Sequence, residues 1–215
     1  IISGIYASEE VIGVNINIDI TKATPIYAED YFRTNLTVYM YREVQPFVWD
    51  KLFRENRIGI FLFSLRDYVT LYSQNIADVR YHLSDLGNLA SEIKKRGGRV
   101  VLNFQGVPRW LSSDPNNESI IPNIGKVWHS VPPRDYELWR MFVYEVVKYF
   151  KDLGLKNSMC YMIGSEPDNY WVGEDNEFHS YYKYGVLGAR QADSGAKVGG
   201  IAPSSVMASK YRDNR

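Results

Sequence analysis

The sequence predicts an α/β fold built on a parallel β-sheet, and three observations lead to this fold class. Short runs rich in β-branched and aromatic residues alternate with longer segments that have helical spacing. Several short runs are apolar throughout, as expected for strands buried on both faces. The chain has 215 residues, enough for one domain with a sizeable core. Such alternation is typical of a parallel sheet with crossover helices.

The first half of the chain contains two predicted strand–helix units. Residues 14–20 alternate apolar and polar side chains with the period of a strand, and residues 47–56 are predicted to form a short helix. Residues 58–65 are nearly all apolar and predict a strand buried on both faces. The next helix is indicated by apolar residues at helical spacing, namely Val79, Leu83, Leu86, Ala90 and Ile93. Gly97 and Gly98 are predicted to end this helix.

The second half continues the alternation. Residues 99–104 predict a buried strand, and residues 105–133 a loop whose length is typical of functional or disordered segments. An amphipathic helix follows, with one apolar face made by Trp139, Phe142, Val143, Val146, Val147 and Phe150. Gly154 is predicted to end this helix. The pattern ends with a strand over residues 160–163, a helix over 178–192 and a strand over 196–201.

Five predicted strands with four helices between them fit either an open doubly wound sheet or a (β/α)8 TIM barrel. A nucleotide-binding open sheet should carry a glycine-rich phosphate loop after its first strand. Residues 21–25 follow the first predicted strand and contain no glycine, which favours the barrel. A complete barrel has eight units and typically about 250 residues. We therefore expect residues 1–215 to be the N-terminal portion of a single (β/α)8 domain, holding strands 1–5, with a further chain or segment completing the barrel.

Composition and charge argue against several classes of function. Lys+Arg and Asp+Glu both number 25, so the formal net charge is zero and gives no electrostatic case for nucleic acid or an anionic membrane. No apolar run reaches the roughly 18 residues of a membrane span. The one cysteine, Cys160, excludes an internal disulfide, and no cluster has metal-ligand spacing, so we expect no metal or cofactor. Because Ile1 is not Met and no basic segment precedes an apolar run, the chain is expected to be a processed or partial product.

Candidate catalytic residues are those at the carboxyl ends of the predicted strands, where barrel enzymes place their chemistry. Polar side chains occur there in four groups, within residues 64–67, 103–105, 165–169 and 202–205. Glu166 is the strongest candidate, because a carboxyl group at the mouth of an apolar strand is partly desolvated. Desolvation raises its pKa and favours the protonated form that an acid catalyst needs. The alternative is a carboxylate that caps the next helix or pairs with Arg66.

Residues 161–171, Tyr-Met-Ile-Gly-Ser-Glu-Pro-Asp-Asn-Tyr-Trp, resemble the fourth-strand motif of the clan A glycoside hydrolases, in which Asn-Glu-Pro ends the strand. Residues 107–113 resemble the Pro-x-Trp-Leu segment of family 39 and its relatives, and residues 197–203 resemble the Lys-Val-Gly-Gly fifth strand. Arg66 matches the arginine that ends the second strand. The resemblance covers about residues 58–205 and is nearest to family 39, with its β-xylosidase-like and α-L-iduronidase-like members.

This resemblance implies a retaining glycosidase with a carbohydrate substrate and Glu166 as general acid/base. The clan's nucleophile is a glutamate at the end of strand seven, which these 215 residues do not reach. A retaining mechanism needs both carboxyl groups, about 5–5.5 Å apart, so the fragment alone is expected to be inactive. Ser165 stands where the family has the asparagine that bonds the sugar 2-hydroxyl, so this contact is altered or lost. The resemblance also slightly favours a secreted protein.

Further residues are predicted to contact the substrate. Stacking on a sugar ring is expected of Trp110, Trp128 and Trp171, and polar contacts are expected of Arg66, His129, Ser165 and Asn169. Each has a structural alternative, which is loop packing for the tryptophans, an ion pair for Arg66, surface exposure for His129 and turn capping for Asn169. The alternative function is a catalytically degenerate barrel that binds carbohydrate or has a structural role, and Ser165 is its main support. A different enzyme on a parallel sheet is disfavoured, because the chain lacks a phosphate loop and a Gly-x-Ser-x-Gly elbow.

Overall fold

The computed structural model describes residues 6–7, 10–11, 59–69, 72–116, 118–121, 125–128, 131–165, 167 and 171–202. The chain divides into two compact units, Ile1–Phe32 and Arg33–Arg215. In the first unit, the described residues form an antiparallel pair of β1 (Tyr6–Ala7) and β2 (Glu10–Val11). The strand predicted over residues 14–20 and the helix predicted over residues 47–56 lie outside the described residues.

The second unit is built on a parallel sheet with the strand order β3-β4-β7-β8. The strands are β3 (Ile60–Ser64), β4 (Arg99–Phe104), β7 (Met159–Ser165) and β8 (Val198–Ala202). Every neighbouring pair in this sheet is parallel. The strands follow one another in chain order, so the sheet has no point where the order reverses, in contrast to a doubly wound sheet. The structure thus confirms the predicted α/β fold with a parallel sheet.

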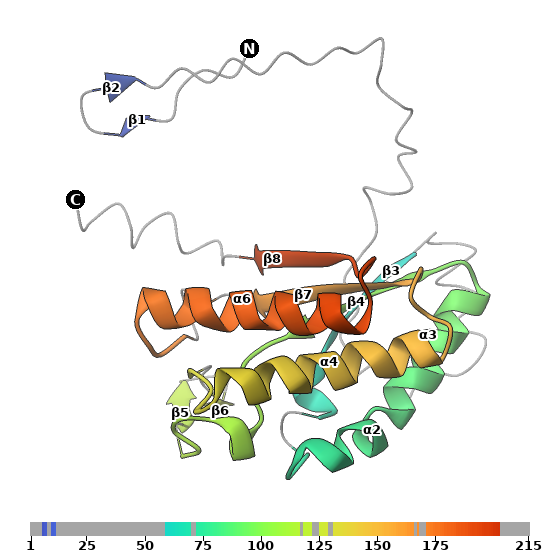
Figure 1. The fold of residues 1–215 in the computed structure, drawn as a ribbon, viewed down its shortest axis with the longest axis horizontal. Coiled ribbons are helices and arrows are strands. Elements are labelled where there is room, and N and C mark those ends of the chain that lie inside the picture. Colours follow the sequence, from blue (N-terminus) through green and yellow to red (C-terminus); the bar gives the residue numbers. More distant parts are fainter. Residues whose placement is uncertain are drawn as a thin grey trace. The chain divides into compact units, whose positions relative to one another are not determined.

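The helices that connect these strands lie on one face of the sheet (Figure 1). They are α2 (Val79–His82), α3 (Ser84–Lys95), α4 (Tyr136–Asp152) and α6 (Asp175–Ala192). Right-handed crossovers that add strands in a constant direction place every helix on the same side. The prediction of one continuous helix around residues 79–93 is wrong in one respect. The helix is divided at Leu83, whose N–H donates to the Arg80 carbonyl at 3.3 Å in a tighter, 3₁₀-like turn.

Local signals explain where these helices begin and end. Asp135 caps α4, because its Oδ1 accepts hydrogen bonds from the backbone N–H groups of Glu137 at 2.9 Å and Leu138 at 3.0 Å. Gly97 follows α3 with a φ of 78°, and Gly154 follows α4 with a φ of 72°. A left-handed backbone of this kind ends a helix and favours glycine. The predicted ends at these two glycines are therefore confirmed.

The core lies between the sheet and its helices. Alternate residues of the strands, such as Phe63, Leu102 and Tyr161, are buried there and are paired in register across β3, β4 and β7. Phe104 packs edge-on against Trp139, with ring centroids 6.1 Å apart. Helices α4 and α6 approach closely at Gly188, where an added Cβ would collide with the Arg140 carbonyl oxygen. Burying each large apolar side chain contributes about 1.5–3 kcal/mol, so this layer is the main source of stability.

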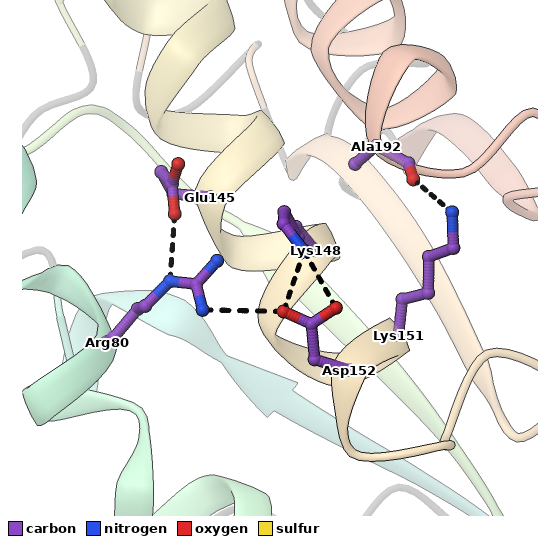
Figure 2. A network of polar contacts seen from close by, with 6 residues as sticks. All are labelled: Arg80, Glu145, Lys148, Lys151, Asp152 and Ala192. Carbon is purple, nitrogen blue, oxygen red and sulfur yellow. Dashed lines mark hydrogen bonds and ion pairs between the residues drawn. The ribbon is translucent and has the colours of Figure 1, made fainter.

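A polar network joins the outer surfaces of the helices (Figure 2). Arg80 of α2 contacts two carboxylates of α4, with Nε 2.9 Å from Glu145 Oε2 and Nη1 3.4 Å from Asp152 Oδ2. Lys148 Nζ lies 2.8 Å from Asp152 Oδ1, and Lys151 Nζ donates to the Ala192 carbonyl at the end of α6 at 2.8 Å. Each of these exposed contacts contributes little stability by itself, but together they connect three helices.

The segment predicted as a loop over residues 105–133 contains regular structure, which corrects that prediction. It holds a 3₁₀ turn at Arg109–Leu111 and a hairpin of β5 (Glu118–Ile121) and β6 (Gly125–Trp128). The physical reason is local, since β-branched residues flank a connection with Pro122 and Asn123, which favour a turn. Backbone hydrogen bonds also close the base of the segment, from Ser113 N to Pro132 O at 3.0 Å and from Arg134 N to Leu111 O at 2.9 Å.

Candidate functional site

The carboxyl ends of the parallel strands meet at one edge of the sheet, where α/β proteins bind ligands. β3 ends at Ser64, β4 at Phe104, and β7 at Ser165. In register, Ser64 pairs with Asn103 on the neighbouring strand, and Ser165 pairs with Ala202. The polar strand ends that the sequence singled out therefore lie on adjacent strands, as expected.

A tyrosine of α6 fastens the end of β4. The Tyr181 hydroxyl donates to the Phe104 carbonyl oxygen at 2.8 Å and lies 3.4 Å from that of Gly106. Its ring stacks on Trp139 with centroids 4.6 Å apart, and Trp139 Nε1 donates to the Tyr181 carbonyl at 2.9 Å. Desolvation raises the pKa of Tyr181 far above its usual value, so the hydroxyl stays protonated and remains a donor. Sequence reasoning missed Tyr181, because an inward tyrosine on a helix carries no distinctive pattern.

Gly164 turns the backbone just before Ser165. Its φ is 82°, and a Cβ added there would meet Phe178 Cζ at 3.0 Å. Both observations require glycine at this position, since other residues rarely adopt a left-handed backbone and would also crowd α6. The glycine thereby sets the direction in which the chain leaves β7.

A small hollow opens beside this turn, between the end of β7 and the first half of α6. It encloses about 180 Å³ of space that includes open solvent. The part of this space that is enclosed by protein accommodates a group about as large as one water molecule and is too small for a sugar ring. Its lining comes from both strand ends and the helix, namely Gly106, Gly164, Ser165, Pro167, Trp171, Phe178 and Tyr181.

Two of the predicted substrate-contacting residues, Ser165 and Trp171, meet in this hollow. The Trp171 ring packs edge-on against Phe178 with centroids 5.1 Å apart, and its Nε1 donates to the Glu174 carbonyl at 3.4 Å. Trp171 N also donates to the Pro167 carbonyl at 2.9 Å, which closes the turn after β7. The half-buried indole is therefore held by packing on one side and borders the hollow on the other.

Trp110 lies elsewhere, within the 3₁₀ turn after β4. Its Nε1 donates to Ser73 Oγ at 3.1 Å, and its ring lies edge-on to Phe142 of α4 at 6.3 Å. The structure does not bring Trp110 into the hollow with Ser165 and Trp171. Arg66 is half-buried and lies in a 3₁₀ turn, Leu65–Asp67, that follows β3.

Several predicted site residues lie in parts of the chain that the structure does not describe. Glu166, Asn169 and His129 lie outside the described residues. Trp128 is the last residue of β6, but its side chain is not among those described. Glu166 follows Ser165, the last residue of β7, so its role stays a prediction that rests on the sequence.

Ser64 and Asn103 have a property that sequence reasoning did not weigh, although both were noted as strand-end polar residues. Asn103 is 5% exposed, and within the described residues neither Asn103 Oδ1 nor Ser64 Oγ has a hydrogen-bond partner. Such atoms are uncommon, because most buried polar groups in proteins are paired. The available signal was the polar residue itself, placed near the end of an otherwise apolar strand.

Other kinds of site have less support in the described part of the chain. No group of three His, Cys, Asp or Glu side chains there could hold a metal ion. None of the helices described is long and apolar enough to cross a membrane.

Solved structures similar to this chain include a xylanase and a glucosidase. A glycoside hydrolase family 30 subfamily 8 xylanase from Clostridium acetobutylicum aligns with a TM-score of 0.54 and 17% identity, over 81% of this chain and 42% of its own. A glucosidase from Croceicoccus marinus aligns with a TM-score of 0.50 and 14% identity, over 71% of this chain and 32% of its own. The chain thus spans less than half the length of either neighbour. No protein-family model and no curated protein matches it. At these identities the likeness shows the fold alone, a mixed α/β fold with a parallel sheet similar to that of TIM-barrel glycosidases.

Proposed function

We propose that this chain is part of a (β/α)8 glycoside hydrolase of clan A that acts by a retaining mechanism. The observation that carries the proposal is the Glu166-Pro167 pair directly after β7, a central strand of an unreversed parallel sheet. The likeness of the fold to two glycosidases supports the same assignment at the level of the clan. The resemblance of residues 107–113 and 197–203 to family 39 remains part of the proposal.

In the proposed mechanism, Glu166 protonates the leaving glycosidic oxygen and then acts as the base for water. A second carboxylate attacks the anomeric carbon and forms the covalent intermediate, and it must lie about 5–5.5 Å from the first. We place this nucleophile on a seventh strand of the complete barrel. Ser165, Arg66 and Trp171 are proposed to contact the sugar, together with Trp110, Trp128, His129 and Asn169.

Ser165 favours a second candidate, a degenerate barrel that binds carbohydrate without cleaving it. Its single hydroxyl replaces an amide that can both donate and accept, so contact with the sugar 2-hydroxyl is weakened or routed through water. Ser165 is half-buried and borders the hollow beside Trp171, which supports a binding role in either case. Both candidate functions involve binding a carbohydrate, but only the first includes its hydrolysis.

The test is hydrolysis of β-xyloside and β-glucoside substrates by the complete protein and by Glu166→Gln. If Glu166 is the acid/base, Glu166→Gln should lower kcat about 10²–10⁴-fold, because a glutamine cannot transfer the proton. The loss should be larger for a disaccharide than for an aryl glycoside, whose leaving group needs less protonation.

Glu137→Gln is the matched control, since Glu137 is an exposed carboxylate of α4 that pairs with Arg140, and the substitution should leave kcat unchanged. The isolated 215-residue chain is expected to be inactive, because the proposal places the nucleophile elsewhere. Equal rates for Glu166→Gln and wild type would refute the role of Glu166. Sugar binding without turnover by the complete protein would establish the degenerate alternative.

A further inference from the structure

Two polar side chains lie side by side near the carboxyl ends of β3 and β4. Ser64 and Asn103 are partners in the parallel register. Paired residues of neighbouring strands lie about 4.8 Å apart and direct their side chains to the same face. Phe104, the next residue after Asn103, packs on Trp139 of α4. Because side chains alternate along a strand, Asn103 and Ser64 belong to the face opposite the helices.

This pair contrasts with the other buried polar side chains of the described residues. Ser73 Oγ accepts from Trp110 Nε1 at 3.1 Å, and Ser112 Oγ accepts from Asp114 N at 3.1 Å. Ser64 Oγ and Asn103 Oδ1 have no partner among the described residues, although both atoms are buried. An unpaired buried oxygen is unfavourable for folding, so its presence asks for an explanation such as a missing ligand or water.

The hydrogen-bonding properties of Ser64 and Asn103 indicate which chemical group could bind to both. A serine hydroxyl can donate one hydrogen bond, whereas the amide Oδ1 of asparagine only accepts. One hydroxyl group can donate to Asn103 Oδ1 and accept from Ser64 Oγ at the same time. A carboxylate or phosphate oxygen cannot donate to Asn103 Oδ1, and an ammonium group, which could donate to both oxygens, would leave the Ser64 proton without an acceptor. The pair is therefore matched to a neutral hydroxyl group.

We propose that Ser64 and Asn103 form a hydroxyl-binding subsite for a sugar on the helix-free face, at the carboxyl end of β3 and β4. The inference rests on the proposed function, which supplies the class of ligand, and it adds two residues outside the Glu166 segment. Ser64 as a residue is only half-buried, so the subsite borders the edge of the sheet where the other candidate residues lie. Arg66, two residues beyond Ser64, follows the same strand.

The experiment measures two quantities on the complete protein, the Kd for xylotriose and cellotriose by calorimetry and the thermal midpoint Tm. The variants are Ser64→Ala, Asn103→Leu and the double variant. Each should weaken binding of the sugar at least tenfold, while the Tm stays equal to that of the wild type or rises. The Tm should not fall, because the substitutions remove oxygens that have no partner among the described residues.

Ser112→Ala is the matched control, since Ser112 is another buried serine, 4% exposed, but its oxygen has a partner. It should lower the Tm and leave the Kd unchanged. Unchanged sugar affinity in Ser64→Ala and Asn103→Leu would overturn the subsite and leave the proposed function standing, with water as the missing partner. A fall in Tm as large as that of Ser112→Ala would assign the pair a structural role. If the wild type binds neither sugar, the proposed function fails and the subsite with it.

Discussion

Single residues determine how the chain leaves the sheet at the candidate site. Gly164 turns the backbone at the end of β7 with a φ of 82°, and Tyr181 holds the end of β4 through the Phe104 carbonyl. Trp171 closes the turn after β7 from the other side. These contacts use backbone groups and buried rings, so they position the strand ends without depending on exposed charges. These contacts also determine the position of Ser165, which follows Gly164 in the chain.

The Tyr181 hydroxyl can be tested by removing one atom. Tyr181→Phe keeps the ring stacked on Trp139 but loses the hydrogen bond to the Phe104 carbonyl. We expect the free energy of unfolding to fall by about 0.5–1.5 kcal/mol, the usual net contribution of such a bond. Urea unfolding measures the change. Tyr72→Phe is the control, because Tyr72 is 56% exposed. Removing its hydroxyl group should change the free energy of unfolding by less than about 0.5 kcal/mol. Equal effects in the two variants would contradict the role given to Tyr181.

At the scale of elements, α4 connects the helical layer. Its apolar face packs on the sheet and on α6, and its outer face carries Glu145 and Asp152, which contact Arg80 of α2. The pKa of Asp152 is lowered by its hydrogen bond to Lys148 and, to a smaller extent, by Arg80. The network therefore links α2 to α4 through charges that titrate in acid.

The lowered pKa of Asp152 predicts a pH dependence with a definite sign. A carboxylate whose folded-state pKa lies below its unfolded value of about 3.9 stabilises the fold above that pH. This contribution is lost as the pH falls through the folded-state pKa. Asp152→Asn should therefore have a lower Tm than wild type near pH 6, and the difference should shrink below about pH 4. High salt should reduce the difference as well, because the pair is exposed.

Glu92→Gln provides the comparison for this experiment. The pKa of Glu92 is also lowered, by Lys95 and then by Arg96, but both partners belong to the same end of α3. We expect a similar shape of the pH curve for Glu92→Gln without a change in the hydrogen exchange of α2, because Asp152 contacts Arg80 of α2 whereas Glu92 pairs with Lys95 and Arg96. A difference in Tm between Asp152→Asn and wild type that stays constant from pH 6 to pH 3 would contradict the assignment.

For the second unit as a whole, the sheet topology predicts which parts open last. β4 and β7 have a strand on both sides, whereas β5 and β6, among the described strands, pair with each other alone in a two-stranded sheet. Two-stranded hairpins are marginally stable by themselves. Native-state hydrogen exchange should therefore be slowest in β4 and β7 and faster, by orders of magnitude, in β5 and β6. Equal protection in all four strands would show that the hairpin is stabilised by contacts beyond its own pairing.

The sequence by itself determined the four parallel strands β3, β4, β7 and β8, the helices between them and their order, except that the helix around residues 79–93 is divided at Leu83. Apolar runs such as residues 99–104 and the apolar stripe of α4 are local patterns, and they match β4 and α4 closely. The ends at Gly97 and Gly154 are equally local, because a left-handed residue is a property of one position. The hairpin within residues 118–128 was missed, since its short strands give a weak periodic signal.

Only the tertiary structure decided what surrounds the candidate residues. It separated Trp110, which packs on α4, from Trp171, which borders the hollow with Ser165. It also showed that Asn103 and Ser64 are neighbours without hydrogen-bond partners among the described residues. Burial and pairing depend on residues distant in the chain, about 39 positions apart in the register of β3 and β4, and local spacing carries no information about them. The role proposed for Glu166 rests on the sequence alone, whereas the contacts that hold the ends of β4 and β7 come from the fold.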